Sequence, residues 1–373
     1  MNIWIDICHT PQYNFYKNFI LRQASIGNTI YVTILDRGKT PQIIRHEIGD
    51  VAGVELFVIG KHRMKKWSAI FEANFLRLLK LLRWTKWRSI DIVFSNCMAA
   101  MIIGRILRVP RYSFDDDPDT IDFMPKKWCS LESNYCLYED AKVAAAGKNV
   151  HVLPCLKEWA YLAPNVFRHN VEALSEYGVQ PKQYLFLREV SVGTVNYAGQ
   201  ASGAVLGIVP EIQKMQALYP ELKVLLSLEE KYRRAEYPAD WILLQEPIKD
   251  IHSLIYYSAG LVSSGDSMAR EAALLGVPAY YLGIRYDMPA NAAAAKVAQL
   301  QNQKTQPIAD WLCNTLSLPP QAAELHQKQL RSHIDNDFID INRYMLELVE
   351  KVQHIQYVQK NHKLDERNRR KPV

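Results

Sequence analysis

The first part of the chain alternates short apolar runs with longer amphipathic stretches. The apolar runs predict β-strands, whereas the stretches between them repeat apolar residues at helical spacing. The predicted strands are 3–7, 29–35, 54–59, 91–95, 111–114, 134–138 and 151–153. The predicted helices are 12–25, 41–50, 68–86 and 98–107. Strands that alternate with helices in this way predict a parallel sheet with right-handed crossovers.

The alternation lapses between about residues 154 and 181 and then begins again. The second series predicts strands 184–187, 223–227 and 241–244 and helices 204–218 and 250–258, and the chain reads as helical from 319 to about 360. A chain of 373 residues exceeds what one hydrophobic core usually serves. We therefore predict two α/β domains, 1–160 and 161–345, and a C-terminal helix with a basic tail at 346–373.

The segment from Leu261 to Tyr281 predicts a buried strand, a turn of small residues, a short helix and a second strand. Small side chains at such a turn let a ligand approach the backbone, and the N–H groups that open the helix attract an anion. The residues of this predicted phosphate cradle are Ser264, Gly265, Asp266, Ser267 and Met268, of which we expect Asp266 to face outward because a carboxylate repels phosphate. Glu271 follows in the first or second helical turn, where its carboxylate can accept hydrogen bonds from two ribose hydroxyls.

A second feature of this half is Arg188, which ends the predicted strand 184–187. Its guanidinium group can bind a diphosphate with two hydrogen bonds. The alternative is an ion pair with Glu189 or another acid. The chain contains neither a Walker phosphate loop nor the glycine pattern of dinucleotide sites, which argues against an ATPase or a dehydrogenase.

Polar residues also follow the predicted strands of the first half. Asp6 and His9 end the first strand, and a histidine there can act as a general base because its ordinary pKa lies near neutrality. Asp115, Asp116 and Asp117 end another strand, and three adjacent carboxylates suggest a metal, a sugar hydroxyl or proton transfer. The alternatives are that Asp6 and His9 only hydrogen-bond the turn, and that the aspartates form an exposed loop with Asp117 as a helix cap.

The net charge of +6 is unevenly distributed. Between Lys61 and Arg88 nine basic residues face one acid, a local net charge of +8. On a helical wheel the apolar side chains of this segment lie on one side, and cations and tryptophans lie on the other. We expect this second side to contact a membrane surface, and its residues are Lys66, Arg77, Lys80, Arg83, Trp84 and Trp87. An ordinary solvated surface helix is the alternative, and no nucleic-acid-binding motif accompanies the patch, so we expect no nucleic-acid partner.

No apolar run is long enough to span a membrane and no signal-peptide pattern is present, which predicts a cytoplasmic protein. The six cysteines lack metal-ligand spacing and fit neither a zinc site nor a disulfide framework. We expect most of them to be packed thiols.

Taken in order, five segments resemble the domain-of-unknown-function 354 family. They are IWIDICHTP at 3–11, VIGKH at 58–62, FDDD at 114–117, FLR at 186–188 and SGDSMAREAALLGVP at 264–278. The family is similar to UDP-N-acetylglucosamine 2-epimerases and glycosyltransferases of the GT-B class. The resemblance implies a GT-B fold with two Rossmann-like, doubly wound α/β domains that face an interdomain cleft, and a C-terminal helix that returns to the first domain. It also implies diphosphate and ribose contacts at Gly265, Ser267 and Glu271 and a phosphate contact at Arg188.

The sequence departs from the epimerase pattern in the first half. Asp115 to Asp117 occupy the place of a His-x-Glu-Ala-Gly-Leu-Arg segment, whose glutamate and arginine are missing here. The opening at His9 also differs from the Arg-Pro-Glu of the epimerases. We therefore expect a glycosyltransferase that moves a sugar from a nucleotide-sugar donor, most simply a UDP-linked one, to a lipid-linked or surface-polysaccharide acceptor. We expect it to act at the cytoplasmic face of the inner membrane and to need neither a cofactor nor a metal. The alternatives are a nucleotide-sugar 2-epimerase and a non-catalytic scaffold of polysaccharide assembly.

Overall fold

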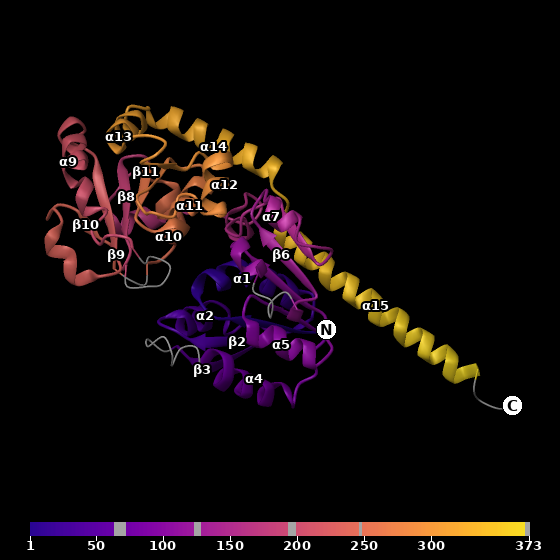
Figure 1. Cartoon of the computed structure of the whole chain (residues 1–373). Helices are drawn as coiled ribbons and strands as arrows, with labels where there is room; N and C mark the ends of the chain where they lie inside the picture. Colours follow the sequence, from indigo (N-terminus) through magenta and orange to yellow (C-terminus); the bar gives the residue numbers. More distant parts are fainter. Residues whose placement is uncertain (63–71, 123–127, 193–198, 246–247, 370–373) are drawn as a thin grey trace. The chain divides into compact units, whose positions relative to one another are not determined.

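The protein is described from a computed structural model, in which the described residues are 1–62, 72–122, 128–192, 199–245 and 248–369 (Figure 1). The chain divides into two compact units, which we call unit 1 and unit 2. Unit 1 comprises Met1–Tyr161 and Ile339–Val373, and unit 2 comprises Leu162–Phe338. The sequence analysis placed residues up to 345 in the second domain and set 346–373 apart, whereas here the chain rejoins unit 1 at Ile339.

Unit 1 contains a seven-stranded parallel sheet with the strand order β3-β2-β1-β4-β5-β6-β7. Its strands are β1 (Asn2–Ile7), β2 (Thr29–Asp36), β3 (Val54–Lys61), β4 (Ile92–Ser95), β5 (Arg111–Asp115), β6 (Glu132–Cys136) and β7 (Val150–Leu153). The order reverses between β1 and β4, and in such sheets ligands bind beyond the carboxyl ends of the strands at this switch point.

The helices of unit 1 connect its successive strands, and the C-terminal helix of the chain also belongs to this unit. They are α1 (Thr10–Ser25), α2 (Thr40–Ile48), the π-helical turn η1 (Glu72–Leu76), α4 (Arg77–Thr85), α5 (Met98–Ile106), the short 3₁₀ helix η2 (Pro118–Asp122), α7 (Ala141–Ala144), α8 (Trp159–Leu162) and α15 (Ile341–Arg369). Helix α15 packs against α1, and Tyr344 at its start donates a hydrogen bond to Asn134 on β6.

Unit 2 contains a six-stranded parallel sheet with the order β10-β9-β8-β11-β12-β13. Its strands are β8 (Tyr184–Glu189), β9 (Lys223–Leu228), β10 (Ile242–Leu243), β11 (Gly260–Ser263), β12 (Ala279–Tyr281) and β13 (Gln301–Asn302). Its helices are η3 (Val171–Tyr177), η5 (Leu206–Ile208), α9 (Val209–Leu218), η6 (Lys231–Glu236), α10 (Ile251–Tyr256), α11 (Asp266–Leu274), α12 (Pro289–Ala298), α13 (Ile308–Leu316) and α14 (Pro320–Asp337). Here the switch point lies between β8 and β11.

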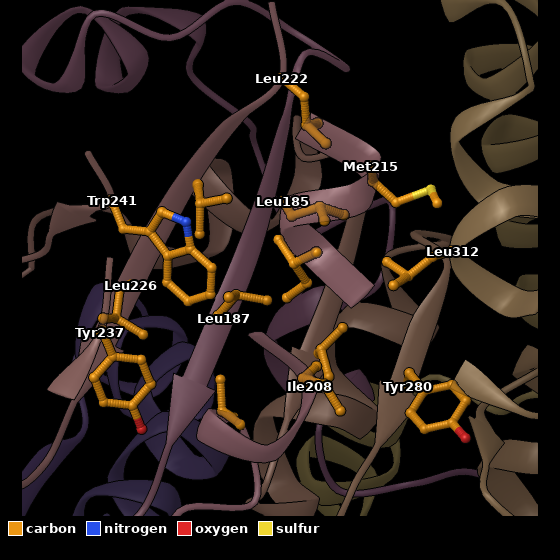
Figure 2. Close-up of a cluster of buried hydrophobic side chains, with 14 of the residues drawn as sticks. Leu185, Leu187, Ile208, Met215, Leu222, Leu226, Tyr237, Trp241, Tyr280 and Leu312 are labelled. Carbon is orange, nitrogen blue, oxygen red and sulfur yellow. The ribbon is translucent and has the colours of Figure 1, made fainter. Parts of the chain in front are cut away.

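The core of unit 2 fills the space between its sheet and the helices α9 and α13 (Figure 2). Leu185, Leu187 and Leu226 project from the central strands and are fully buried. Trp241 is buried beside them and satisfies its indole N–H by donating to Gln216 Oε1 at 3.0 Å. Dense apolar packing of this kind makes β8 and β9 a rigid support for residues at their carboxyl ends.

Gly276 follows helix α11 and its C-cap residue Leu275, with a left-handed φ of +71°. A Cβ atom at this position would lie 2.6 Å from the carbonyl oxygen of Gln327 on α14. Only glycine fits both the backbone conformation and this close approach. The turn places β12 directly after α11, so the predicted strand, turn, helix and strand of residues 261–281 are confirmed.

Candidate functional site

The predicted phosphate cradle follows β11 at the switch point of unit 2. Ser263 pairs with Arg188 across β11 and β8, so the carboxyl ends of the two strands lie side by side. The Ser263 hydroxyl both donates to the carbonyl of Gly265 and accepts from its N–H, at 2.7 and 3.0 Å, which closes the turn before α11. This arrangement directs the first N–H groups of α11 beyond the end of the sheet, as expected for an anion site.

The buried residue Glu189 holds the cradle in place through hydrogen bonds inside the protein. The sequence analysis did not select Glu189 as a site residue. One carboxylate oxygen of Glu189 accepts from the Ser264 hydroxyl at 2.9 Å, and the other accepts from the Val205 N–H at 2.7 Å and the Tyr237 hydroxyl at 3.3 Å. The Ser264 hydroxyl is therefore engaged inside the protein. Ser264 therefore helps to shape the cradle, and the backbone N–H groups of the cradle are the groups that can contact a ligand.

Asp266 does not face outward, contrary to the sequence-based expectation. Its side chain is buried at the first turn of α11, where one oxygen accepts from the Ser267 N–H at 2.9 Å. Its other oxygen pairs with Arg270 at 3.5 Å and with Arg285 at 3.3 Å. Two guanidinium groups therefore offset the Asp266 carboxylate beside the helix N-terminus.

Arg188 lies at the end of β8, but its guanidinium group is already engaged. It donates to the Ser227 hydroxyl at 2.7 Å and pairs with Glu229 at 2.5 Å, which is the ion-pair alternative considered above. Glu229 also accepts the N–H of Ser191 at 2.9 Å. Arg188 is thus held in one orientation at the edge of the cradle.

Glu271 lies one turn further along α11 and is nearly buried. Its carboxylate lies 3.5 Å from Nε2 of His252 on the neighbouring helix α10. Helix α10 begins after Asp250, which caps it by accepting the Ser253 N–H, and this cap places His252 in its first turn. His252 was missed from the sequence, where the only signal was a polar residue after a capping aspartate. The pair gives the cradle a carboxylate fixed by an imidazole.

In unit 1 the structure separates the five predicted polar residues. Asp6 is fully buried at the end of β1, where it accepts from both terminal nitrogens of Arg77 and from the Thr33 hydroxyl. A carboxylate closed off in this way is a structural counter-ion, which corrects its assignment to catalysis. Arg77 also reaches the carbonyl of Ile59, and Gly60 makes room for it, since a Cβ there would lie 2.9 Å from the Arg77 Cδ.

The three aspartates after β5 take three different roles. Asp115 is buried and accepts from the Asp116 N–H and the Thr120 hydroxyl. Asp117 accepts from the Asp119 N–H and so caps the turn of η2, as the alternative interpretation proposed. Asp116 is partly exposed and pairs with Lys157 at 3.1 Å. Asp116 is therefore the aspartate whose position best suits contact with a substrate.

His9 is the N-cap residue of α1. The Gln12 N–H points to its Nδ1 at a long 3.4 Å, which leaves Nε2 as the atom placed to take a proton. Burial, then the nearby cations Lys157 and Arg37, lower the pKa of His9 from 6.5 to about 4, against a smaller opposing effect of Asp116. The imidazole is consequently neutral at pH 7 and able to accept a proton.

The lowered pKa of His9 predicts a pH-dependent stability. Because the unfolded chain takes up this proton near pH 6.5 and the folded one near pH 4, stability should fall as pH falls through that window. The loss from this group is about 3 kcal/mol. His9→Asn, which keeps an N-cap side chain, should flatten this part of a urea-denaturation pH profile. Parallel profiles for the two proteins would contradict the burial of His9.

Cys8 and Cys97 form a disulfide at the switch point of unit 1, so these two of the six cysteines are not free packed thiols. Cys8 follows β1 and Cys97 follows β4, and both approach Gln12 of α1. Cys129, Cys136 and Cys155 are buried free thiols, as expected. Among the described residues, Asp6, Cys8 and Cys97 form the one cluster with metal-ligand spacing, but the Asp6 carboxylate already pairs with Arg77.

Helix α4, which belongs to the basic segment 61–88, does not place all of its predicted membrane-contact residues on one exposed side. Arg77 is buried with Leu81 and Thr85, and its guanidinium group pairs with the Asp6 carboxylate inside unit 1. It therefore cannot make the contact with a membrane surface that was predicted. Trp84 is half-buried against Trp4 and Phe57, at ring distances of 5.3 and 5.2 Å. Lys66 lies outside the described residues.

The outer face of α4 and its flanking turns combines cations with apolar side chains, including leucines that the wheel assigned to the interior. We call this set the α4 face, and its members are Phe75, Leu79, Lys80, Leu82, Arg83, Lys86 and Trp87. Lys80 pairs with Glu72 at 3.1 Å, and Trp87 is 80% exposed with Lys86 over its ring. Within the described part of the chain, no helix is long and apolar enough to cross a membrane.

Solved structures show that the protein has a two-domain, Rossmann-like GT-B fold. The UDP-GlcNAc 2-epimerase of Neisseria meningitidis, solved with UDP-GlcNAc, is 12% identical with a TM-score of 0.64, over 94% of this chain and 100% of that one. The spinosyn rhamnosyltransferase SpnG, solved with the spinosyn aglycone, is 11% identical with a TM-score of 0.62, over 94% and 100% of the two chains. SpnG has also been solved with thymidine diphosphate, with the same coverage, identity and TM-score. No family model and no curated protein sequence matches this chain.

Proposed function

We propose that the protein is a GT-B glycosyltransferase that uses a nucleotide-sugar donor. The observation that carries the proposal is the cradle of unit 2, in which α11 begins directly after β11, Arg270 and Arg285 pair with Asp266 at its first turn, and the Glu271 carboxylate follows one turn further along beside His252. Helix-end N–H groups and arginines suit a diphosphate, and a carboxylate one turn along suits the two hydroxyls of a ribose. The epimerase and SpnG structures, whose names include UDP-GlcNAc and thymidine diphosphate, support a donor of this class.

In the proposed reaction the acceptor hydroxyl oxygen forms a bond to the anomeric carbon of the sugar. The bond from that carbon to the diphosphate oxygen breaks, and its electron pair leaves with the nucleoside diphosphate. The N–H groups that open α11 stabilise the leaving diphosphate. His9 Nε2 takes the acceptor proton, and Asp116 stabilises the imidazolium that results. No step of this scheme calls for a metal ion.

An epimerase is the second candidate, because an epimerase is among the structural neighbours. The two activities separate in one experiment, in which the protein is incubated with UDP-GlcNAc in deuterated water without an acceptor. An epimerase incorporates deuterium at C2 of the sugar, whereas a glycosyltransferase leaves C2 unlabelled and releases UDP only when an acceptor is added. We expect no label, because Asp115 to Asp117 stand in the place of the epimerase segment and its glutamate and arginine are missing there. Deuterium at C2 would overturn the proposal.

For the acceptor we propose a lipid-linked or surface glycan reached at the inner leaflet of the membrane. The support is the α4 face, where exposed leucines and a tryptophan stand among cations. Indole rings and cations together suit an interface of anionic lipid, where the ring lies at headgroup depth.

The α4 face predicts reversible binding to anionic vesicles. Leu79→Ser with Trp87→Ser should weaken sedimentation with phosphatidylglycerol vesicles by roughly tenfold, because both side chains leave water on binding. Leu218→Ser with Tyr232→Ser removes two exposed apolar residues of unit 2 and serves as the control. Equal vesicle binding by both double variants would argue against the α4 face as the contact.

A further inference from the structure

A hollow in unit 1 lies outside the candidate site and is lined by three arginines. Its volume is about 540 Å³, and it opens at the amino end of β5. The lining residues are Arg105, Arg108, Val109, Pro110, Arg111 and Leu131. Arg111 begins β5 and Asp115 ends it, so the hollow lies roughly 13 Å from the aspartates, at the opposite edge of the sheet. It is therefore separate from the chemistry proposed above.

Two of the three guanidinium groups are fixed by backbone carbonyls. Arg105 stacks on the Trp128 ring, 3.6 Å from its centroid, and donates to the Trp128 carbonyl at 2.9 Å. Arg111 donates to the carbonyls of Val109 and Cys129. Carbonyls orient a guanidinium group without neutralising it, so these contacts leave both charges in place.

The hollow carries a net positive charge. Within the part of the chain that the structure describes, none of the three arginines pairs with a carboxylate. Burial, and then the neighbouring Arg105 cation, lower the pKa of Arg111. An anion bound among the three arginines would relieve the repulsion between them, and the fixed planar groups match the oxygens of a phosphate.

Arg108 supplies the third cation of the hollow. Arg108 has a left-handed φ of 59°, in the turn that joins α5 to β5. A non-glycine residue in this conformation costs free energy, and asparagine or glycine would fit more easily. The turn nevertheless holds a third arginine at the mouth of the hollow.

We propose that this hollow binds a phosphate group, carried by an anionic lipid headgroup or by a soluble phosphate compound. The lipid source is favoured by the rim, where Trp128 is 57% exposed and Ile106, Leu107 and Leu131 are exposed with it. Helix α5, which contributes Arg105 to the lining of the hollow, also packs against α4 (Figure 1). The inference does not depend on the proposed transferase activity.

The test compares two double variants of the full-length protein that lose the same charge. Arg105→Gln with Arg108→Asn removes two cations of the hollow, and asparagine tolerates the backbone of Arg108. Arg22→Gln with Arg45→Gln removes two exposed cations from α1 and α2 and is the matched control. Arg108→Asn alone is the second variant, and it should fold normally because asparagine suits a left-handed φ.

Two probes distinguish the sources of the phosphate. One is sedimentation with phosphatidylcholine vesicles with and without phosphatidylglycerol, and the other is calorimetric titration with inorganic phosphate. We expect the hollow variant to bind anionic vesicles at least about tenfold more weakly than the control variant does, with a smaller loss for Arg108→Asn. A matching loss seen only with inorganic phosphate would identify a soluble ligand and keep the phosphate site. Equal behaviour of the hollow and control variants with both probes would overturn the proposal.

Discussion

Replacing Arg77 with methionine should lower the free energy of unfolding of unit 1 by about 3–5 kcal/mol, because it leaves a buried carboxylate without its cation. Asp6 is fully buried and its remaining partner is the Thr33 hydroxyl, which in turn accepts the indole N–H of Trp4. Water cannot reach the carboxylate to replace the guanidinium group. Urea denaturation followed by tryptophan fluorescence measures the loss.

Two further variants isolate the ion pair as the cause. Arg83→Met removes an exposed arginine from the same helix and should change stability by less than about 0.5 kcal/mol. Asp6→Asn combined with Arg77→Met removes both charges and should recover part of the stability that Arg77→Met loses. If Arg77→Met and Arg83→Met are equally stable, the buried pair does not hold β1 to α4 as described.

Replacing Glu271 with glutamine should weaken binding of the cognate nucleoside diphosphate roughly 100-fold, since the charged acceptor for two ribose hydroxyls is lost. Glutamine keeps the size of the side chain, so α11 and the cradle should remain folded. Isothermal titration calorimetry measures the affinity. Glu324→Gln, at an exposed position on α14 of the same unit, is the control and should bind as the unaltered protein does.

The result for Glu271→Gln must be separated from general damage to unit 2. Its thermal unfolding temperature without nucleotide should stay close to that of the unaltered protein, while the increase caused by nucleotide should disappear. An unchanged affinity would remove Glu271 from the site. A large fall in stability without nucleotide would instead assign the pair of Glu271 and His252 to folding.

The sequence was sufficient for the fold and for the strand, turn and helix that make up the predicted cradle. Short apolar runs at 3–7, 184–187 and 261–263 read as strands because each is buried on both faces, and the structure has β1, β8 and β11 there. The turn at Ser264 and Gly265 was predictable because serine and glycine between a strand and a helix favour a tight turn. These features are local, so periodicity and residue size reveal them.

Contacts between residues that lie far apart in the chain could not be predicted from the sequence. The sequence analysis placed Arg77 among the residues expected at a membrane surface, although its position four residues before Leu81 puts it on the buried stripe of α4. Only the buried carboxylate of Asp6, 71 residues away, makes that position acceptable for a charge. Asp266 was misplaced for the same reason, because Arg285 lies 19 residues further along the chain. Glu189 was overlooked because its partners Val205 and Tyr237 come from two separate segments.

The central claim is that unit 2 binds a nucleoside diphosphate through the cradle after β11. A thermal-shift titration of the full-length protein with UDP, GDP, CMP and TDP, and with their common sugar conjugates, tests it most directly. We predict that one base raises the unfolding temperature in a concentration-dependent way, because a ligand that binds only the folded state stabilises it by mass action. No shift with any of these nucleotides, at concentrations up to the millimolar range, would contradict the account.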